Sequence, residues 1–209
     1  MSTNIRKRRT QERTEITRNK LLDAATKLFS EQGFDGISIR DLEKAADVQR
    51  GLLTYHFGDK ESLWKVAADR TFGTMNEEVN ARADILKDLS SYERIATMIR
   101  FYVRYSARHP EFSRLLSQEG RQDSWRIRYL AENHVSKITR SLESPVRKEL
   151  GLDKTEFMHW FYMLAGAAAT IFSHSPECQL LYGVDSREEV VVDAHADMMV
   201  KMLMEPFKK

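Results

Sequence analysis

The hydrophobic positions in the first third of the chain recur with the period of an α-helix. One stripe occupies positions i, i+3, i+4, i+7 and i+8: Leu21, Ala24, Ala25, Leu28 and Phe29. This spacing predicts a helix over residues 16–33. Shorter apolar stripes, each bounded by serine or glycine, predict further helices over 38–46 and 50–57 and from 60 to about 72. Only residues 47–49 separate the second helix from the third, so these two form a tight helical hairpin.

The rest of the chain also has helical periodicity. Five candidate helices lie near residues 91–108, 111–119, 124–149, 154–174 and 187–204. The last two are apolar on two sides, and such a helix is buried on both sides. We expect one side to fill the subunit core and the other to meet a second copy in a four-helix bundle. The residues expected at that interface are Tyr162, Ala165, Ala169, Val192, Ala196, Met199 and Leu203.

Length and composition narrow the class of protein. The chain has 209 residues, enough for one small and one larger domain, each with its own core. No stretch approaches the roughly 18 uninterrupted apolar residues of a membrane-spanning helix, and the charged N-terminus does not resemble a secretory signal. Cys178 is the single cysteine, which excludes an internal disulfide and a cysteine-based zinc cage. We therefore expect a soluble, cytoplasmic, all-α protein.

Positive charge is concentrated at the start of the chain. The net charge is +2, yet residues 1–20 carry seven basic residues against two acidic ones, a balance of +5. The remainder is therefore slightly acidic. A basic arm over residues 1–14 fits a segment that lies along DNA phosphates or in a minor groove. A solvated tail without a partner is the alternative.

The hairpin carries the most specific pattern in the chain. Residues 38–64 read SIRDLEKAADVQRGLLTYHFGDKESLW. This run resembles the DNA-binding domain of the TetR family of bacterial transcriptional regulators, and the resemblance covers about residues 15–75. The matching positions are Phe29, Gly33, Phe34, Ala45, Ala46, Val48, Gly51, Leu53, Tyr55, His56, Phe57, Lys60, Glu61 and Leu63. The resemblance implies a helix-turn-helix at about 38–57 and a C-terminal effector-binding and dimerisation domain over 76–209.

Three positions depart from the family pattern. Asp47 replaces the usual turn glycine, and aspartate can adopt a left-handed conformation at modest cost. Gln49 replaces the serine that caps the recognition helix; because glutamine is a poor cap, we expect its side chain to contact DNA instead. Thr54 stands where the family often has tyrosine. These changes leave the fold intact but make the operator sequence hard to infer.

The DNA contacts follow from the docking geometry of a helix-turn-helix. A recognition helix enters the major groove N-terminus first, so Gln49, Arg50, Leu52 and Thr54 are expected to face base edges. Arg50 can bind guanine in a bidentate manner, and Gly51 permits close backbone approach. The family resemblance implies phosphate contacts by five further residues, Ser38, Arg40, Tyr55, His56 and Lys60, with Thr54 as an additional phosphate contact. The alternative for each is a surface polar residue.

The resemblance also implies a small-molecule effector in the C-terminal domain, acting through the fourth helix. The candidate pocket residues are Tyr105, Phe112, Leu116, Glu119, Trp125, Tyr129, His134, Trp160 and Met163. Large aromatic residues at helical spacing pack in most cores, so core packing is the alternative for each. Glu119 and His134 could orient a polar or cationic ligand.

Taken together, the sequence predicts a homodimeric repressor that binds a palindromic operator and is released by an effector. An enzyme is disfavoured, because the chain has no Gly-x-Ser-x-Gly, no phosphate-binding glycine loop and no cysteine set at metal spacing. We expect neither a cofactor nor a metal. A sequence-independent architectural DNA-binding protein that uses the basic arm alone is the alternative function.

Overall fold

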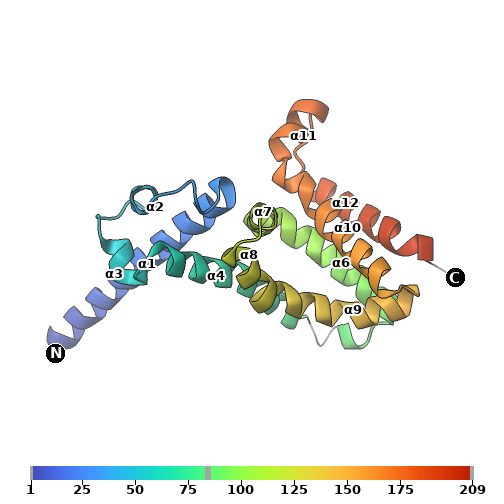
Figure 1. Ribbon diagram of the computed structural model, residues 1–209, viewed down its shortest axis with the longest axis horizontal. Coiled ribbons are helices and arrows are strands. Elements are labelled where there is room, and N and C mark those ends of the chain that lie inside the picture. Colours follow the sequence, from blue (N-terminus) through green and yellow to red (C-terminus); the bar gives the residue numbers. More distant parts are fainter. Residues whose placement is uncertain (1, 83–85, 208–209) are drawn as a thin grey trace. The chain divides into compact units, whose positions relative to one another are not determined.

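The computed structural model describes residues 2–82 and 86–207, with side chains from residue 11 onward. Every regular element in this described part is helical (Figure 1), which confirms the all-α prediction. The chain divides into two compact units, Met1–Gly73 and Thr74–Lys209. Within the same described residues, no helix combines the length and the apolar character needed to cross a membrane.

The first unit is built from α1 (Ser2–Gln32), α2 (Ile39–Ala45), α3 (Leu52–Phe57) and the beginning of α4 (Lys60–Asn80). Each of these helices contributes a side chain that is sealed from solvent: Leu21, Phe29, Leu42, Leu53, Leu63 and Trp64. The apolar stripes of the sequence therefore face a common core. The short helices α2 and α3 depend on this shared core, because helices of their length are not stable alone in water.

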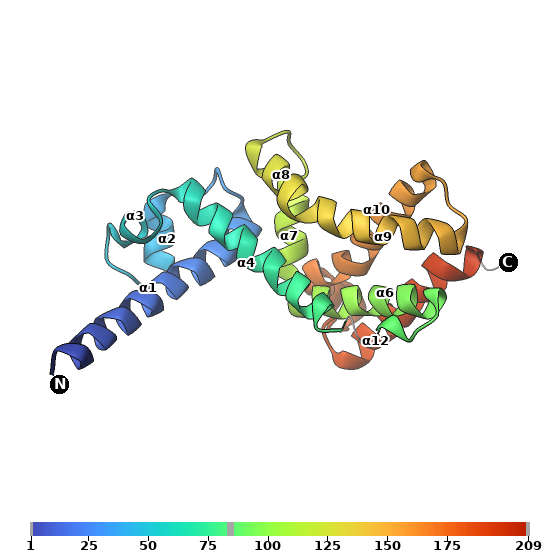
Figure 2. The ribbon, with the colours of Figure 1, turned by 90° about the horizontal axis from the view of Figure 1, so that it is seen from below.

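Helix α1 is longer than the sequence pattern predicted. Its backbone is helical from Ser2, so the basic arm forms the first turns of the same helix and is not a separate segment (Figure 2). Residues 2–15 lack an apolar stripe, which is why periodicity missed them, although arginine, lysine, glutamine and glutamate favour helix. The side chains of residues 6–9 lie outside the described part.

The second unit contains the end of α4 and a larger helical array. Its elements are α6 (Ser91–Arg108), α7 (Pro110–Glu119), α8 (Trp125–Leu130), the π-helical turn η1 (Ala131–Val135), α9 (Ser136–Leu150), α10 (Lys154–Ser173), α11 (Ser175–Tyr182), α12 (Glu189–Met204) and the 3₁₀ turn η2 (Glu205–Phe207). No helix was expected between residues 174 and 187, where α11 lies with Pro176 in its first turn. Proline is tolerated in the first turn of a helix, where its missing N–H is not needed, and it occupies that turn here.

Helices α6, α10 and α12 pack side by side and form the core of the second unit (Figure 1). Val103 of α6, Trp160 and Phe172 of α10 and Ala196 of α12 are sealed within it. The indole N–H of Trp160 donates to the carbonyl oxygen of Leu203 at 3.0 Å, so its polar group is satisfied in the core. At the surface, two ion pairs join α6 to α12: Arg100 to Asp197 at 2.9 Å and Arg104 to Asp193 at 2.8 Å.

The two apolar sides of α12 are the reverse of the prediction. The four α12 residues expected at a dimer interface lie in the subunit core instead, with no more than 7% exposure: Val192, Ala196, Met199 and Leu203. Ala169 of α10 is buried as well. The outward stripe of α12 contains Val190, Met198 and Met202. Periodicity finds two apolar sides but cannot rank them, because the inner side is decided by which one meets α6.

Two neighbouring methionines test this assignment. Met199 is 2% exposed and Met198 is 58% exposed. Met199→Ala should lower the free energy of unfolding by about 2–5 kcal/mol, since it leaves a cavity in the subunit core. Met198→Ala should change it by less than about 0.5 kcal/mol in the dilute monomer. Urea denaturation of both variants at low protein concentration measures the difference, and equal losses would contradict the assignment.

Candidate nucleic-acid interface

Helix α2 begins with a capping box. The hydroxyl of Ser38 accepts from the backbone N–H of Asp41 at 3.2 Å, and the Asp41 carboxylate accepts from the backbone N–H of Ser38 at 2.9 Å. The Ser38 hydroxyl also donates to this carboxylate. These bonds hold the pKa of the Asp41 carboxyl below its ordinary value. Ser38, expected to contact phosphate, therefore has its amide and hydroxyl engaged in starting the helix.

The turn between α2 and α3 contains two residues with left-handed backbone. Asp47 has φ of 52°, which confirms that it adopts this conformation in place of glycine. Gly51, the residue before α3, has φ of 91°. A Cβ at Gly51 would meet nothing within 4 Å, so the backbone angle and not space explains the glycine. The turn thus fixes the direction in which α3 leaves α2.

The N-terminus of α3 is held by a residue that the sequence analysis missed. Glu43 of α2 is 4% exposed, and its Oε1 accepts from the backbone N–H of Gly51 at 2.7 Å and of Leu53 at 3.1 Å. The residue at the N-cap position makes no side-chain cap. Glu43 therefore satisfies two of the N–H groups that a helix start leaves open, and its charge is favourable there. Only the three-dimensional hairpin brings Glu43 to this point.

A set of exposed side chains surrounds the start of α3. Gln49, Arg50 and Thr54 are exposed, as the groove assignment requires, and Tyr55 is 75% exposed. Leu52 is half-buried, so only part of its side chain is accessible. Arg40 on α2 is exposed as well. Arg40 lies on α2, Gln49 and Arg50 lie in the turn that follows it, and Thr54 and Tyr55 lie on α3.

Two of the residues expected to contact phosphate, Lys60 and His56, make contacts within the protein. Lys60 donates from Nζ to the carbonyl oxygens of Phe34 at 2.9 Å and Ile37 at 2.8 Å, and lies over the Phe34 ring. Its ammonium thus ties α4 to the loop before α2, and it is not an outward-pointing cation. His56 is half-buried, and burial, aided by the charge of Arg18, lowers its pKa. A neutral His56 can offer a phosphate a ring N–H but no charge.

The residues expected to bind an effector do not form one group. Tyr105, Phe112 and Trp160 are at most 2% exposed, so packed neighbours and not open space surround them. Met163 is 51% exposed on the outward side of α10. The other members, Leu116, Glu119, Trp125, Tyr129 and His134, come from α7, α8 and the π-helical turn and are buried or half-buried. Sequence periodicity could not separate these locations.

A buried ion pair joins α7 to α8. Arg126 donates from Nε to Oε2 of Glu119 at 2.7 Å, and the two side chains are 10% and 3% exposed. Oε1 of Glu119 is buried without a hydrogen-bond partner. The ring of Tyr129 meets that of His134 edge to face, with 6.0 Å between the ring centroids. A buried carboxylate oxygen in this state has unused capacity to accept a hydrogen bond.

A separate surface pocket of about 520 Å³ lies between α6 and α12. It is lined by Tyr92, Ala96 and Arg100 on one side and by Val200 and Lys201 on the other, among others, and includes none of the expected effector residues. No group of three or more His, Cys, Asp or Glu side chains within the described residues is arranged to hold a metal ion.

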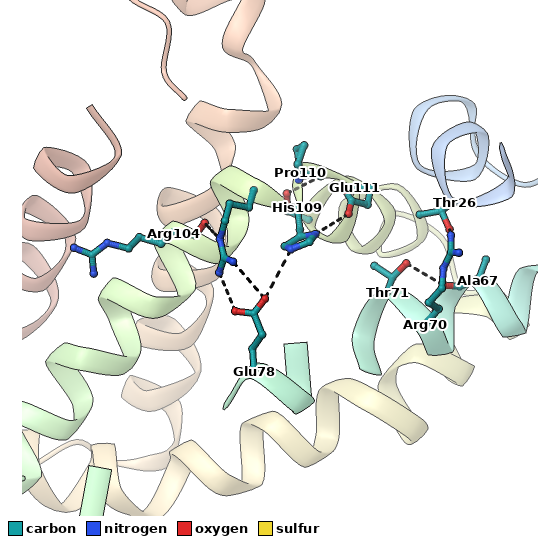
Figure 3. A network of polar contacts seen from close by, with 11 residues as sticks. Thr26, Ala67, Arg70, Thr71, Glu78, Arg104, His109, Pro110 and Glu111 are labelled. Atoms are coloured by element: carbon teal, nitrogen blue, oxygen red, sulfur yellow. Dashed lines mark hydrogen bonds and ion pairs between the residues drawn. The ribbon is translucent and has the colours of Figure 1, made fainter. Parts of the chain in front are cut away.

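The end of α4 is fixed to the junction of α6 and α7 (Figure 3). Arg108 donates to both carboxylate oxygens of Glu78, at 2.9 and 3.4 Å, and the ring of His109 approaches Glu78 at 4.0 Å. Nδ1 of His109 is 3.2 Å from Glu111. The hydrogen bonds from Arg108, with the charges of Arg108 and Arg82, hold the pKa of Glu78 below its ordinary value. Glu78 is therefore the ionic anchor of α4 in the second unit.

The role of Glu43 can be tested by two substitutions. Glu43→Ala leaves the N–H groups of Gly51 and Leu53 without their acceptor and should lower the free energy of unfolding by about 1–3 kcal/mol. Glu43→Gln keeps a carbonyl oxygen in the same place and should recover part of that loss. Urea denaturation measures both, and an alanine variant as stable as the wild type would refute the capping role.

The Glu78 anchor should depend on pH. Because its folded pKa is depressed, the folded state binds fewer protons than the unfolded state in acid, so the stabilisation exists at neutral pH and is lost as pH falls through the carboxyl range. Glu78→Gln should cost about 1 kcal/mol at pH 7 and progressively less toward lower pH. Urea denaturation against pH measures this, with Glu177→Gln on α11 as control. A difference from wild type that stays constant with pH would contradict it.

Comparison with known proteins identifies the family. The chain matches the model of bacterial regulatory proteins of the tetR family over residues 21–67, and that of the Tetracyclin repressor-like C-terminal domain over residues 92–203, more than half of the chain. It is 29% identical over 156 residues to the HTH-type transcriptional repressor NicS of Pseudomonas putida, covering 71% of this chain and 72% of NicS. It is 25% identical over 121 residues to the probable regulator YttP of Bacillus subtilis, spanning 58% of each chain.

A solved structure shows the same fold. AibR in complex with isovaleryl coenzyme A and operator DNA superposes with a TM-score of 0.69 at 19% identity, over 91% of this chain and 100% of AibR. At this identity the likeness concerns the fold alone. The two family models, which together match both units, carry the assignment. The chain therefore belongs to the TetR family: it is a DNA-binding transcriptional regulator and not an enzyme.

Proposed function

We propose that the chain is a homodimeric repressor that binds a palindromic operator in the cytoplasm and is released by a small-molecule effector. The observation that carries the proposal is the exposed surface around the start of α3. Gln49 and Arg50 lie in the turn before this helix and Thr54 lies on it, and Glu43 holds its N-terminus. Arg40 and Tyr55, both exposed, flank these residues and are suited to contact phosphates. The basic first turns of α1 add charge for the same purpose.

The dimer requires a second apolar surface, and the outer side of α10 and α12 offers one. Large exposed hydrophobic side chains there are Met158, Tyr162, Met163, Val190, Met198 and Met202. Tyr162 and half-buried Ala165 remain from the interface expected from sequence; the other residues replace the buried ones. A two-fold axis through this surface would pair two helices from each subunit. Two recognition helices on one body can then read a palindrome.

The effector site is proposed around α7, α8 and the π-helical turn. The unpartnered oxygen of Glu119 and the half-buried Leu116, Trp125 and Tyr129 support this place. Helix α7 starts directly after the junction that holds Glu78, and α4 runs from that anchor into the first unit. A ligand that moves α7 would therefore act on α4 and change the presentation of α3.

Selection of genomic DNA fragments by the purified protein tests the proposal. At near-physiological salt the bound fragments should share a palindrome, and one compound in a panel of metabolites should release them. Uniform recovery of all fragments would favour the architectural alternative, which the charge of the first 20 residues supports. If the bound fragments share a palindrome but no compound releases them, the proposed sequence-specific repressor is supported and the proposed release by an effector is contradicted.

Arg50 and Arg40 provide a matched pair for the groove assignment. Arg50→Ala should weaken operator binding by about 1–3 kcal/mol and relax the base preference at one operator position, because a base contact is lost. Arg40→Ala should weaken binding to all sequences alike and reduce the salt dependence by roughly one phosphate contact. Fluorescence anisotropy with operator variants at several salt concentrations distinguishes the two. Wild-type affinity and base preference in Arg50→Ala would contradict the assignment.

A further inference from the structure

Helix α11 leaves its apolar side chains uncovered. Leu180 is 87% exposed, Leu181 65% and Tyr182 76%, and Val184, just after the helix, is 41% exposed. No residue of the helix is buried. Of the twelve large hydrophobic side chains that are exposed in the described part of the chain, these four belong to α11 and its C-terminal turn. Exposed apolar side chains are ordinary when scattered, but a contiguous group marks an interaction surface.

The three apolar side chains in the last turn of α11 are not covered by their own subunit. Leu180, Leu181 and Tyr182 follow one another at steps of about 100°, so they project in three directions. A single flat surface would bury at most one or two of them. The last turn of α11 is therefore apolar in several directions and requires cover on more than one side.

The position of α11 is nevertheless defined by its ends. The hydroxyl of Ser175, at the start of the helix, donates to the carboxylate of Asp185, beyond its end, at 3.2 Å. This bond joins the two ends of the segment that contains α11. The hydroxyl of Ser186 donates to the carbonyl oxygen of Ile171 at 3.1 Å, and Arg187 donates to that of Phe172 at 3.3 Å. Gly183 ends the helix with a left-handed backbone. The exposed apolar side chains of α11 are thus carried by a segment whose two ends are hydrogen-bonded to defined positions.

Continuity with the outer side of α10 and α12 indicates what covers α11. The helix follows α10 and precedes α12, and Figure 1 shows it at the end of this pair that lies away from α9. Ten of the twelve exposed large hydrophobic side chains lie between Met158 and Met202 on these three elements. A stable interface uses about 800 Å² and roughly 20–30 residues from each partner, more than the six large side chains of α10 and α12 supply. The four of α11 extend the same surface.

We propose that α11 is a dimerisation arm that packs against a second copy of this chain, beside the α10–α12 surface. The inference rests on the proposed homodimer and adds a separate element to it. The arm buries Leu180, Leu181 and Tyr182 against the partner, and so the isolated subunit is the state in which they are exposed. Its base stays with its own subunit through Ser186 and Arg187.

Sedimentation equilibrium of the full chain tests the arm. The variant Leu180→Gln/Leu181→Gln keeps good helix formers but removes apolar surface, and should weaken the dimer 10- to 100-fold. Glu177→Gln, an exposed change on the same helix, should leave the dimer constant within twofold. Circular dichroism of the diluted proteins should be the same for all three, since no buried contact is changed.

Met198→Gln, on the exposed stripe of α12, distinguishes the contribution of α11 to dimerisation from that of the α10–α12 surface. If Met198→Gln weakens the dimer while the α11 double variant dimerises within twofold of wild type, the arm is refuted and the homodimer stands. A wild-type chain that stays monomeric at the highest concentration tested would overturn the proposed dimer and the arm together. Weakening by both variants, with Glu177→Gln unaffected, is the expected result.

Discussion

The positions of the residues that we propose to contact DNA depend on the hydrogen bonds that the Glu43 carboxylate accepts at the start of α3. Helix α3 has six residues and would not persist alone in water. Its N-cap residue, Gly51, makes no side-chain cap, and Glu43 from the preceding helix accepts hydrogen bonds from the backbone N–H groups of Gly51 and Leu53. The left-handed angles of Asp47 and Gly51 let the chain turn back so that this can occur. Gln49 and Arg50 therefore project from a surface fixed by a buried charge and two backbone angles.

The second unit depends on a different constraint, the apolar character of α12 on two sides. Its inner side, with Ala196 and Met199, packs into the core with α6 and α10. Its outer side, with Val190 and Met198, remains exposed in the single chain. One helix can thus serve both the fold of the subunit and, in our proposal, its dimerisation. Helix α4 links this unit to the first, with Glu78 as its ionic anchor to Arg108.

The parts of this picture that could be predicted from sequence are those set by local pattern. The stripe from Leu21 to Phe29, the cap at Ser38 and the left-handed Asp47 all follow from residue type and spacing. What could not be predicted depends on contacts distant in sequence. In the sequence, Glu43 and Lys60 look like ordinary surface charges. Only the folded hairpin brings Glu43 to the start of α3, and only the fold brings Lys60 to two backbone carbonyls. The two sides of α12 are distinguished only by the packing of one of them against α6. Helix α11 was not predicted, because its eight residues include Pro176 and are too few to show a helical stripe.

The salt dependence of binding to a selected operator, compared with a scrambled duplex of equal length, tests the central claim most directly. A sequence-specific regulator should bind the operator at least about 1,000-fold more tightly than the scrambled duplex at physiological salt. This preference should persist as salt rises, because base contacts do not depend on counterion release. Equal affinities for the two duplexes, both falling steeply with salt, would contradict it. The basic first turns of α1 would then account for binding, and the surface around Arg50 would have no role in reading sequence.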